Sequence, residues 1–159
     1  MPICVASRAS ERRVPRGLTT ALGAIVRTTL TLERRTAGEI TIVLARDPEL
    51  RELNRRWRGI DRATDVLSFP YGDRGRRVDG DLVISLDRLA AQAKRYRVSP
   101  GKELARLIVH GTLHLAGHDH HRASERTLMR RQERGAMKAC SRRVAALERA
   151  LARVAPAAR

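Results

Sequence analysis

The sequence predicts a single α+β domain, and three observations lead to that fold class. The chain has 159 residues, which is an ordinary size for one domain and too short for two of common size. Apolar residues make up 42% of it, enough to bury one core without disulfides, and the 3% aromatic content leaves that core mainly to Leu, Val, Ile and Ala. Segments with strand periodicity come early and helical segments late, which favours α+β over a doubly wound sheet.

The first half of the chain alternates short strands with helices. Residues 2–6 are compatible with a short strand, and Pro15 opens a helix to about residue 30, because a first-turn proline lacks only an N–H that would have no helical partner. Residues 39–45 (EITIVLA) alternate apolar positions and predict a strand. Asp47 and Pro48 then form a cap followed by a proline, which predicts a helix to Trp57 that ends at Gly59.

The second half of the chain becomes mostly helical. Two further strands are expected at 65–69 and 81–86, joined by a polar, glycine-containing loop over 71–79. The expected helices cover 87–97 with Asp87 as cap, 100–115 after the Ser99-Pro100 pair, and a long last segment from Ser124 to about Ala150, kinked at Gly135. This last segment includes a basic Ala/Arg-rich tail from about residue 140, and the whole of 1–159 is expected to be one domain.

The charge of the chain indicates a polyanionic partner. Lys and Arg total 33 against 17 Asp and Glu, a formal net charge of +16, which is typical of proteins that bind nucleic acid. An arginine-favouring GC-rich genome is the alternative, and it explains the dominance of Arg but not the excess of positive charge. With only four aromatic residues (one Trp, two Tyr and one Phe), nucleic-acid binding is expected to be mainly electrostatic rather than through base stacking.

The cysteines and the apolar segments bear on location. Cys4 and Cys140 have no spacing typical of a disulfide framework, which favours a reducing compartment. No uncharged apolar stretch approaches the length of a membrane span or of a signal-peptide core. A cytoplasmic protein without membrane contact is therefore expected.

All five histidines lie within the twelve residues from 110 to 121. His110 and His114 are four residues apart on the predicted helix, so both imidazoles stand on one face about one turn apart. Gly117 ends that helix and allows the chain to bring His118 or His120 back to the same place. Three imidazoles with an open fourth position are typical of a catalytic zinc site. A polar or pH-sensitive histidine patch is the alternative, but the H-x3-H-x5-H spacing after an apolar helix favours a metal.

The same spacing fits the metzincin protease motif H-E-x-x-H-x-x-G-x-x-H, except at one position. Gly111 stands where that motif has the glutamate that takes a proton from the zinc-bound water. A metzincin-like zinc-binding helix is therefore expected, whereas a peptidase mechanism lacks its proton acceptor.

Three ordered sequence blocks resemble the YbeY family of endoribonucleases, which are rRNA maturation factors. HGTLHLAGHDH resembles the histidine signature of that family, and LNRRWRGIDRATDVLSFP and GDLVIS resemble two further blocks that precede it. Met129 and Glu133 also stand where the family has a Met and a Glu. The resemblance covers residues from about 39 to 137.

This resemblance implies a mixed sheet of about four strands packed with helices, and a zinc-dependent endoribonuclease that acts on single-stranded RNA. It implies a role in 16S rRNA 3′-end maturation and ribosome quality control, with rRNA and the ribosome as partners and no DNA. The implied metal ligands are His110, His114 and His120, with His118 and His121 outside the ligand set.

The resemblance also implies functional roles for three residues outside the histidine cluster. Arg58 is expected to be catalytic and to neutralise the scissile phosphate with its planar guanidinium, and Asp65 and Ser68 are expected to contact substrate near the metal. Asp119, which precedes a ligand in the chain, is expected either to orient an imidazole or to move a proton.

Two other functions stay open from the sequence. The first is a zinc metallopeptidase, which Gly111 disfavours. The second is a non-catalytic ribosome-associated factor with a structural metal, because no obvious general base accompanies the histidines. Zinc is the preferred ion, although imidazoles also suit nickel, copper and iron.

Overall fold

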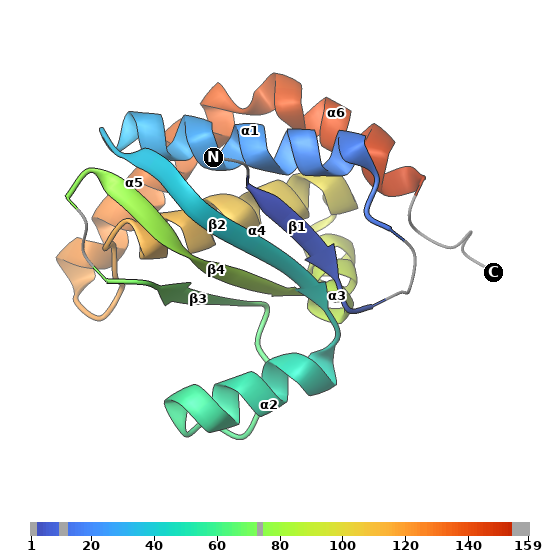
Figure 1. Cartoon of the computed structure of the whole chain (residues 1–159), viewed down its shortest axis with the longest axis horizontal. Helices are drawn as coiled ribbons and strands as arrows, with labels where there is room; N and C mark the ends of the chain where they lie inside the picture. The colour runs from blue at the N-terminus through green and yellow to red at the C-terminus, as the bar shows by residue number, and fades with distance from the viewer. Residues whose placement is uncertain (1–2, 10–12, 73–74, 154–159) are drawn as a thin grey trace.

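The computed structural model describes residues 3–9, 13–72 and 75–153 of the chain. Within these residues, a four-stranded sheet is packed with six helices (Figure 1), which confirms the α+β fold class and the mixed sheet. The elements follow in the order β1 (Cys4–Ser7), α1 (Arg16–Leu32), β2 (Thr36–Ala45), α2 (Asp47–Arg58), β3 (Val66–Pro70), β4 (Arg77–Ser85), α3 (Leu86–Tyr96), α4 (Pro100–Leu115), α5 (Ala123–Ala139) and α6 (Ser141–Ala152).

The sheet has the strand order β1-β2-β4-β3. β1 is parallel to β2 and β2 is parallel to β4, whereas β3 returns antiparallel beside β4 and forms an edge of the sheet. β2 and β4 pair over most of their length, with a register shift between Ala37 and Ile40. The antiparallel β3 thereby lies next to β4 and against α4, the helix that carries the first two histidines.

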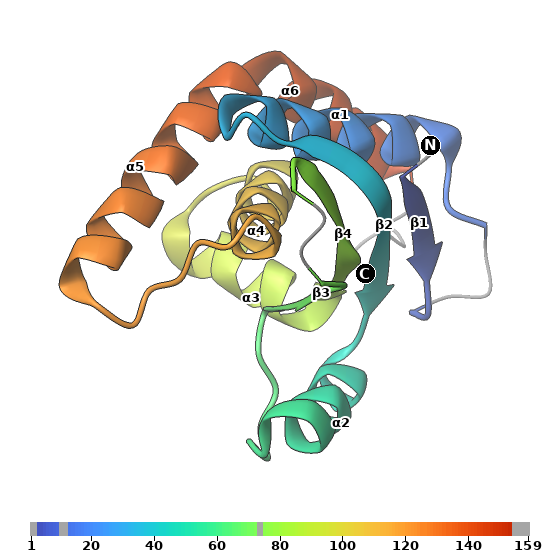
Figure 2. The same cartoon turned by 60° about the vertical axis from the view of Figure 1, so that its left-hand side comes forward.

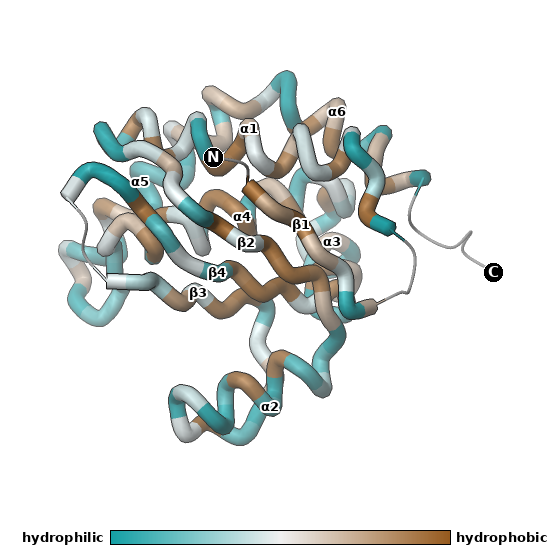
Figure 3. The backbone as a smooth tube through the Cα atoms, viewed as in Figure 1, coloured by the Kyte–Doolittle hydropathy of each residue, from teal (hydrophilic) through white to brown (hydrophobic). Residues whose placement is uncertain are grey.

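The two faces of the sheet bury different sets of apolar side chains. Ile40, Ile42 and Leu44 of β2 point into the main core with the apolar sides of α1 and α4, as the alternation along that strand predicts. A smaller cluster on the opposite face joins Ala45, Leu50, Leu67 and Val83 beneath α2. Figure 2 shows α4 along one face of the sheet and α2 standing apart from the other helices, and in Figure 3 the central parts of the strands are strongly hydrophobic.

The last helical segment differs from the sequence expectation. A kink at Gly135 is wrong, because Gly135 lies inside a continuous α5 and the chain instead breaks at Cys140. Cys140 is fully buried and its backbone leaves the helical conformation, with φ −91° and ψ 5°. The chain then continues as α6, which contacts α1 and α4 and buries Leu147 and Ala150. Residues 154–159 of the predicted tail lie outside the described residues.

Several predicted boundaries shift by a few residues. β4 begins at Arg77, so the loop expected over 71–79 is shorter, and β2 likewise begins at Thr36. Asp79 of β4 links the earlier parts of the two strands. Its carboxylate accepts the backbone N–H of Glu39 at 2.7 Å and forms an ion pair with Arg77 at 2.9 Å. The N-caps of α1, α2 and α3 are Pro15, Arg46 and Ser85, each one or two residues from the predicted start. Residue 2 of the predicted first strand lies outside the described residues.

Over the described ranges, no helix combines the length and the apolar character needed to cross a bilayer.

Candidate metal centre

The helix α4 presents His110 and His114 from its half-buried side. Ser99 caps this helix, since its Oγ accepts the backbone N–H of Lys102 at 3.2 Å, and Pro100 follows in the first turn. Leu104, Leu107 and Ile108 are fully buried and fix the rotation of the helix against the core. The two histidines, which both retain partial exposure, therefore face the side where α4 meets β3 and α5.

Gly111 lets α4 approach the sheet closely between these two histidines. A Cβ atom at this position would lie 2.9 Å from Leu82 Cδ2 and 3.2 Å from Val66 Cγ2. The carbonyl oxygen of Gly111 also accepts a hydrogen bond from Ser68 Oγ at 3.1 Å. The space that a metzincin glutamate would need next to the metal is therefore filled by the sheet, which explains in physical terms why this chain lacks that base.

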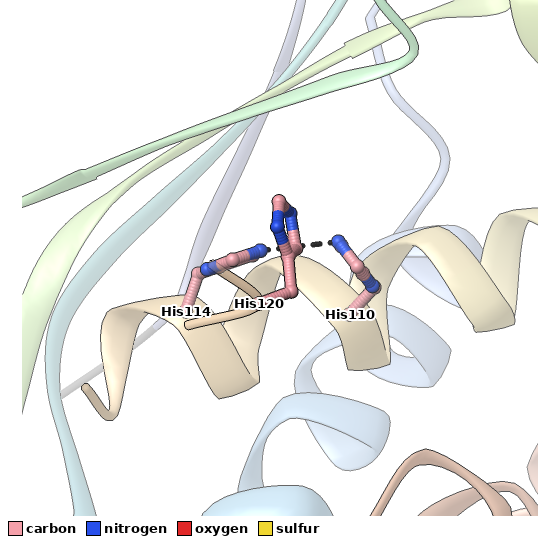
Figure 4. A group of neighbouring side chains, drawn as sticks. All are labelled: His110, His114 and His120. Carbon is pink, nitrogen blue, oxygen red and sulfur yellow. Dashed lines mark hydrogen bonds between the residues drawn. The ribbon is translucent and has the colours of Figure 1, made fainter. Parts of the chain in front are cut away.

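A tight turn after α4 returns the chain to the two histidines. Gly117 adopts φ +100°, which an L-residue with a side chain rarely adopts. The backbone N–H of His118 then donates to the carbonyl of Leu113 at 3.0 Å. Beyond the turn, the ring of His120 comes back to within 4.9 Å of the His114 ring, measured between centroids, and 5.9 Å of the His110 ring (Figure 4).

His110, His114 and His120 form a compact group of candidate ligands. Their ligand nitrogens lie within 4.8 Å of one another, and the Nε2 atoms of His110 and His114 are 3.1 Å apart. Two imidazole nitrogens at that separation can both reach a zinc ion at about 2.0–2.1 Å. The structure thus brings together the three residues that the family resemblance implies as ligands.

The tautomers of the first two histidines can be assigned from their other ring nitrogens. Nδ1 of His114 faces the backbone carbonyl of His118 at 2.9 Å and must donate to it. Nδ1 of His110 contacts the carboxylate of Glu133, which reaches over from α5. The ring proton of each histidine is therefore on Nδ1, so Nε2 of His110 and Nε2 of His114 both carry a lone pair and face one another. Two facing lone pairs repel, and a cation bound between them would relieve that repulsion.

Burial also keeps His114 in the form that binds metal. Desolvation by burial, followed by electrostatic interaction with the neighbouring His110 and His120, lowers the pKa of His114 to about 4. This imidazole is therefore neutral near pH 7 and its Nε2 lone pair is available. Three imidazole ligands with a fourth position left for water or substrate are typical of a catalytic zinc site.

The remaining two histidines have other partners. His118 Nε2 lies 2.8 Å from Glu33 Oε2 at the end of α1, and Glu33 Oε1 also accepts a hydrogen bond from Gln132. His121 is 79% exposed and pairs with Asp119 at 3.1 Å. Neither residue belongs to the three-histidine group.

The sequence suggested one carboxylate beside the candidate ligands, Asp119, whereas the structure places two there, Asp119 and Glu133. Asp119 Oδ1 accepts the backbone N–H of His120 at 2.8 Å, and this hydrogen bond is the main cause of the lowered pKa of Asp119. Its contacts are thus to the ligand loop and to the ring of His121. The carboxylate that touches a candidate ligand ring is Glu133, 23 residues from His110 in the chain, and only its family position hinted at this role.

The three other candidate residues lie in different surroundings. Ser68 packs against α4 through its hydrogen bond to Gly111. Asp65 accepts hydrogen bonds from the N–H of Val66 at 2.8 Å and from Gln92 at 3.1 Å, which tie the start of β3 to α3. Arg58 is the exposed last residue of α2 and lines a pocket of about 470 Å³ with Asn54, Ile60, Arg62, Ala63, Thr64 and Arg88. The histidines do not line that pocket.

Comparison with known proteins places this centre in a family. A protein from an Anaeromyxobacter species with the name endoribonuclease YbeY is 48% identical over 101 residues, which cover 62% of this chain and 53% of that protein. The chain therefore spans about half the length of this relative. A Desulforamulus reducens protein of the same name is 35% identical over 144 residues, covering 85% of this chain and 94% of the relative.

The structural comparison agrees with the sequence comparison. The solution structure of TM1509 from Thermotoga maritima superimposes with a TM-score of 0.60 at 26% identity, covering 87% of this chain and 88% of that one. The family model described as endoribonuclease YbeY matches residues 6–141, which include every strand from β2 onward, the three histidines and Glu133. This chain belongs to the YbeY family.

Proposed function

We propose that the protein is a zinc-dependent endoribonuclease that cleaves single-stranded RNA. The observation that carries this proposal is the convergence of three imidazoles whose tautomers direct two Nε2 lone pairs to one point, in a chain of the YbeY family. The relatives named endoribonuclease supply the reaction class. The net charge of +16 suits an RNA substrate.

The residues around the histidines would act on a phosphodiester as follows. His110, His114 and His120 would hold a zinc ion, which would supply Lewis-acid polarisation of a phosphoryl oxygen or a bound water of lowered pKa. Arg58 neutralises the charge of the scissile phosphate with its guanidinium. Ser68, beside Gly111, and Asp65, at the start of β3, contact the substrate strand.

The cellular role proposed here is rRNA processing in the cytoplasm. Maturation of the 16S rRNA 3′ end and ribosome quality control provide single-stranded rRNA as substrate, and the ribosome is the expected partner. The net charge of +16 and the few aromatic residues favour mainly electrostatic binding, for which the ribosomal context would supply the sequence specificity.

A cleavage assay tests the reaction class. Labelled single-stranded RNA, duplex RNA, single-stranded DNA and casein are each incubated with the protein, with and without a chelator. Chelator-sensitive cleavage of single-stranded RNA alone is expected. The His120→Ala variant, purified in parallel, controls for contaminating ribonuclease and should be inactive. Cleavage of casein, or RNA cleavage that this variant retains, contradicts the proposal.

Zinc analysis of five single alanine variants tests the ligand set. Substitution of His110, His114 or His120 should abolish stoichiometric zinc, because each removes one of three donors. Substitution of His118 or His121 should leave the zinc content unchanged, since their rings bond carboxylates instead. Full zinc in His120→Ala removes that residue from the site.

The role of Arg58 is tested against a neighbour on the same helix. Arg58→Glu should abolish RNA cleavage while zinc content and melting temperature stay close to those of the unsubstituted protein. Arg56→Glu makes the same change of charge at another exposed position of α2 and should retain most of the activity. Equal activity of the two variants shows that Arg58 has no specific role.

A further inference from the structure

The helix α5 carries a positively charged residue at every fourth position along one side. Arg126, Arg130, Arg134 and Lys138 are all exposed, and residues four apart are neighbours on a helix surface. We call these four residues the α5 cationic row. On the opposite side of α5, Met129 and Ala136 are buried, so packing leaves the row facing solvent.

The row begins at the loop that carries the third candidate ligand. Arg126 Nη1 donates to the backbone carbonyls of His120 and His121, at 3.3 and 3.0 Å. Glu133, which contacts His110, lies on the same helix between Arg130 and Arg134. Figure 2 shows α5 as an outer helix that leads away from the end of α4. The row therefore starts beside the loop of the third candidate ligand, runs past Glu133 at the metal centre and continues beyond it to Lys138.

The positive charges of the row have no ion-pair partner among the described residues. Over the part of the chain that the structure describes, no carboxylate forms an ion pair with a member of the row. The two acidic residues of α5 have other partners: Glu125 accepts the backbone N–H of Arg122, and Glu133 contacts His110. Like charges four residues apart destabilise a helix, so the row is a cost to the free protein that an anionic ligand relieves.

The spacing of the row suits a chain of phosphates. Four residues along a helix advance by about 6 Å, which is close to the separation of successive phosphates in an extended nucleic-acid strand. Arginine binds phosphate with a planar fork and needs no particular base. A row of this kind fits a strand that runs lengthwise along α5 and carries no information about sequence.

From these observations we propose that the α5 cationic row binds the phosphate backbone of single-stranded RNA and leads it to the metal centre. This inference rests on the proposed function for the identity of the polyanion. It adds the path of the strand on the protein surface, which the three histidines and Arg58 do not define.

The test compares two triple variants that change the net charge equally. The row variant is Arg130→Glu/Arg134→Glu/Lys138→Glu, and Arg126 is left intact because it holds the ligand loop. The control is Arg16→Glu/Arg27→Glu/Arg95→Glu, at three exposed arginines of α1 and α3. Binding of a fluorescent single-stranded RNA to the full-length protein is titrated at several salt concentrations, in EDTA so that the RNA stays intact.

The row variant should bind at least about tenfold more weakly, and the slope of log K against log salt should lose about 2 in magnitude, since each single-strand phosphate contact contributes about 0.7. The control should stay within about threefold of the unsubstituted protein and keep its slope. Zinc content should be unchanged in both variants. Equal weakening of both, or no weakening of either, overturns the proposal.

Two further measurements keep the result unambiguous. If the row variant does not fold, the neutral variant Arg130→Gln/Arg134→Gln/Lys138→Gln removes the same contacts and should show the same loss of slope. Vesicles containing phosphatidylserine are titrated in parallel, and loss of vesicle binding with RNA affinity retained overturns the proposal in favour of a membrane. RNA cleavage is measured separately. If RNA affinity depends on the row but the protein does not cleave RNA, the proposed function is refuted and the proposal for the row is not.

Discussion

At the scale of single residues, the candidate metal centre depends on groups that hold the Nδ1 side of the His110 and His114 rings. His110 is held by a side chain from α5, and His114 by a backbone carbonyl in the turn after α4. The sequence indicated that His110 and His114 are neighbours, because a helix brings residues four apart together, whereas His120 was implied by the family resemblance. It pointed to Asp119 as their partner by proximity in the chain. The contact of Glu133 depends on how α5 packs against α4, which local sequence patterns do not encode.

Glu133→Gln should weaken zinc binding by about 10–100-fold, the usual effect of losing a carboxylate behind a ligand imidazole. Glutamine keeps the shape of the side chain and loses the charge that raises the basicity of His110. Asp119→Asn, the matched control, should change zinc affinity by less than about threefold, because Asp119 contacts the backbone of His120 and not its ring. Competition against a fluorescent zinc chelator measures both. A larger effect at Asp119 reverses the assignment.

At the scale of elements, local sequence signals predicted whether a segment forms a helix or a strand better than they predicted where that element begins and ends. The cap-plus-proline pairs at Ser99 and Pro100 placed the start of α4 correctly, because capping is a local interaction. The early start of β4 depends on its pairing with β2 through Asp79, and the break at Cys140 depends on burial of that residue. Both are tertiary effects, and a glycine such as Gly135 is a poor guide to a break when helix packing continues past it.

Two of the helical glycines, Gly111 and Gly135, should respond oppositely to alanine. A Cβ at Gly111 meets the buried Leu82 at 2.9 Å, whereas one at Gly135 meets nothing within 4 Å. Gly135→Ala should therefore raise the free energy of unfolding by about 0.5–1 kcal/mol, through helix propensity. Gly111→Ala should lower it by about 1–2 kcal/mol, because overpacking exceeds that gain. Urea titrations measure both, and stabilisation by Gly111→Ala would show that α4 has room to move.

At the scale of the whole molecule, α6 contributes buried side chains to the main hydrophobic core. The basic, alanine-rich composition after residue 140 indicated a helix but not what it covers. In the structure, α6 lies against α1 and α4, and Glu148 of α6 packs over Gly101, where even a Cβ would lie 3.0 Å from the Glu148 backbone. The helix α4, which carries His110 and His114, is thus packed between the sheet and α6.

Leu147→Ala should lower the free energy of unfolding by about 2–5 kcal/mol, because the side chain is fully buried and leaves a cavity between α6 and the core. Leu128→Ala, at a leucine that is 47% exposed on α5, should change it by no more than about 0.5 kcal/mol. Urea unfolding followed by circular dichroism gives both values. Equal effects at the two positions would show that α6 is detached in solution.

Metal binding should stabilise the whole fold, because the three ligands come together only when α4, its following turn and α5 are in place. A ligand that binds only the folded state adds about 2.7 kcal/mol to the free energy of unfolding at a hundredfold excess over its Kd. Unfolding by urea in zinc and in EDTA should differ by about that amount at such a zinc concentration. His120→Ala should remove the difference at little cost to the EDTA value, since His120 lies in an exposed loop. A zinc effect that persists in this variant would place the ion elsewhere, and a zinc effect absent from the unsubstituted protein would show that the histidines do not bind it in the folded state.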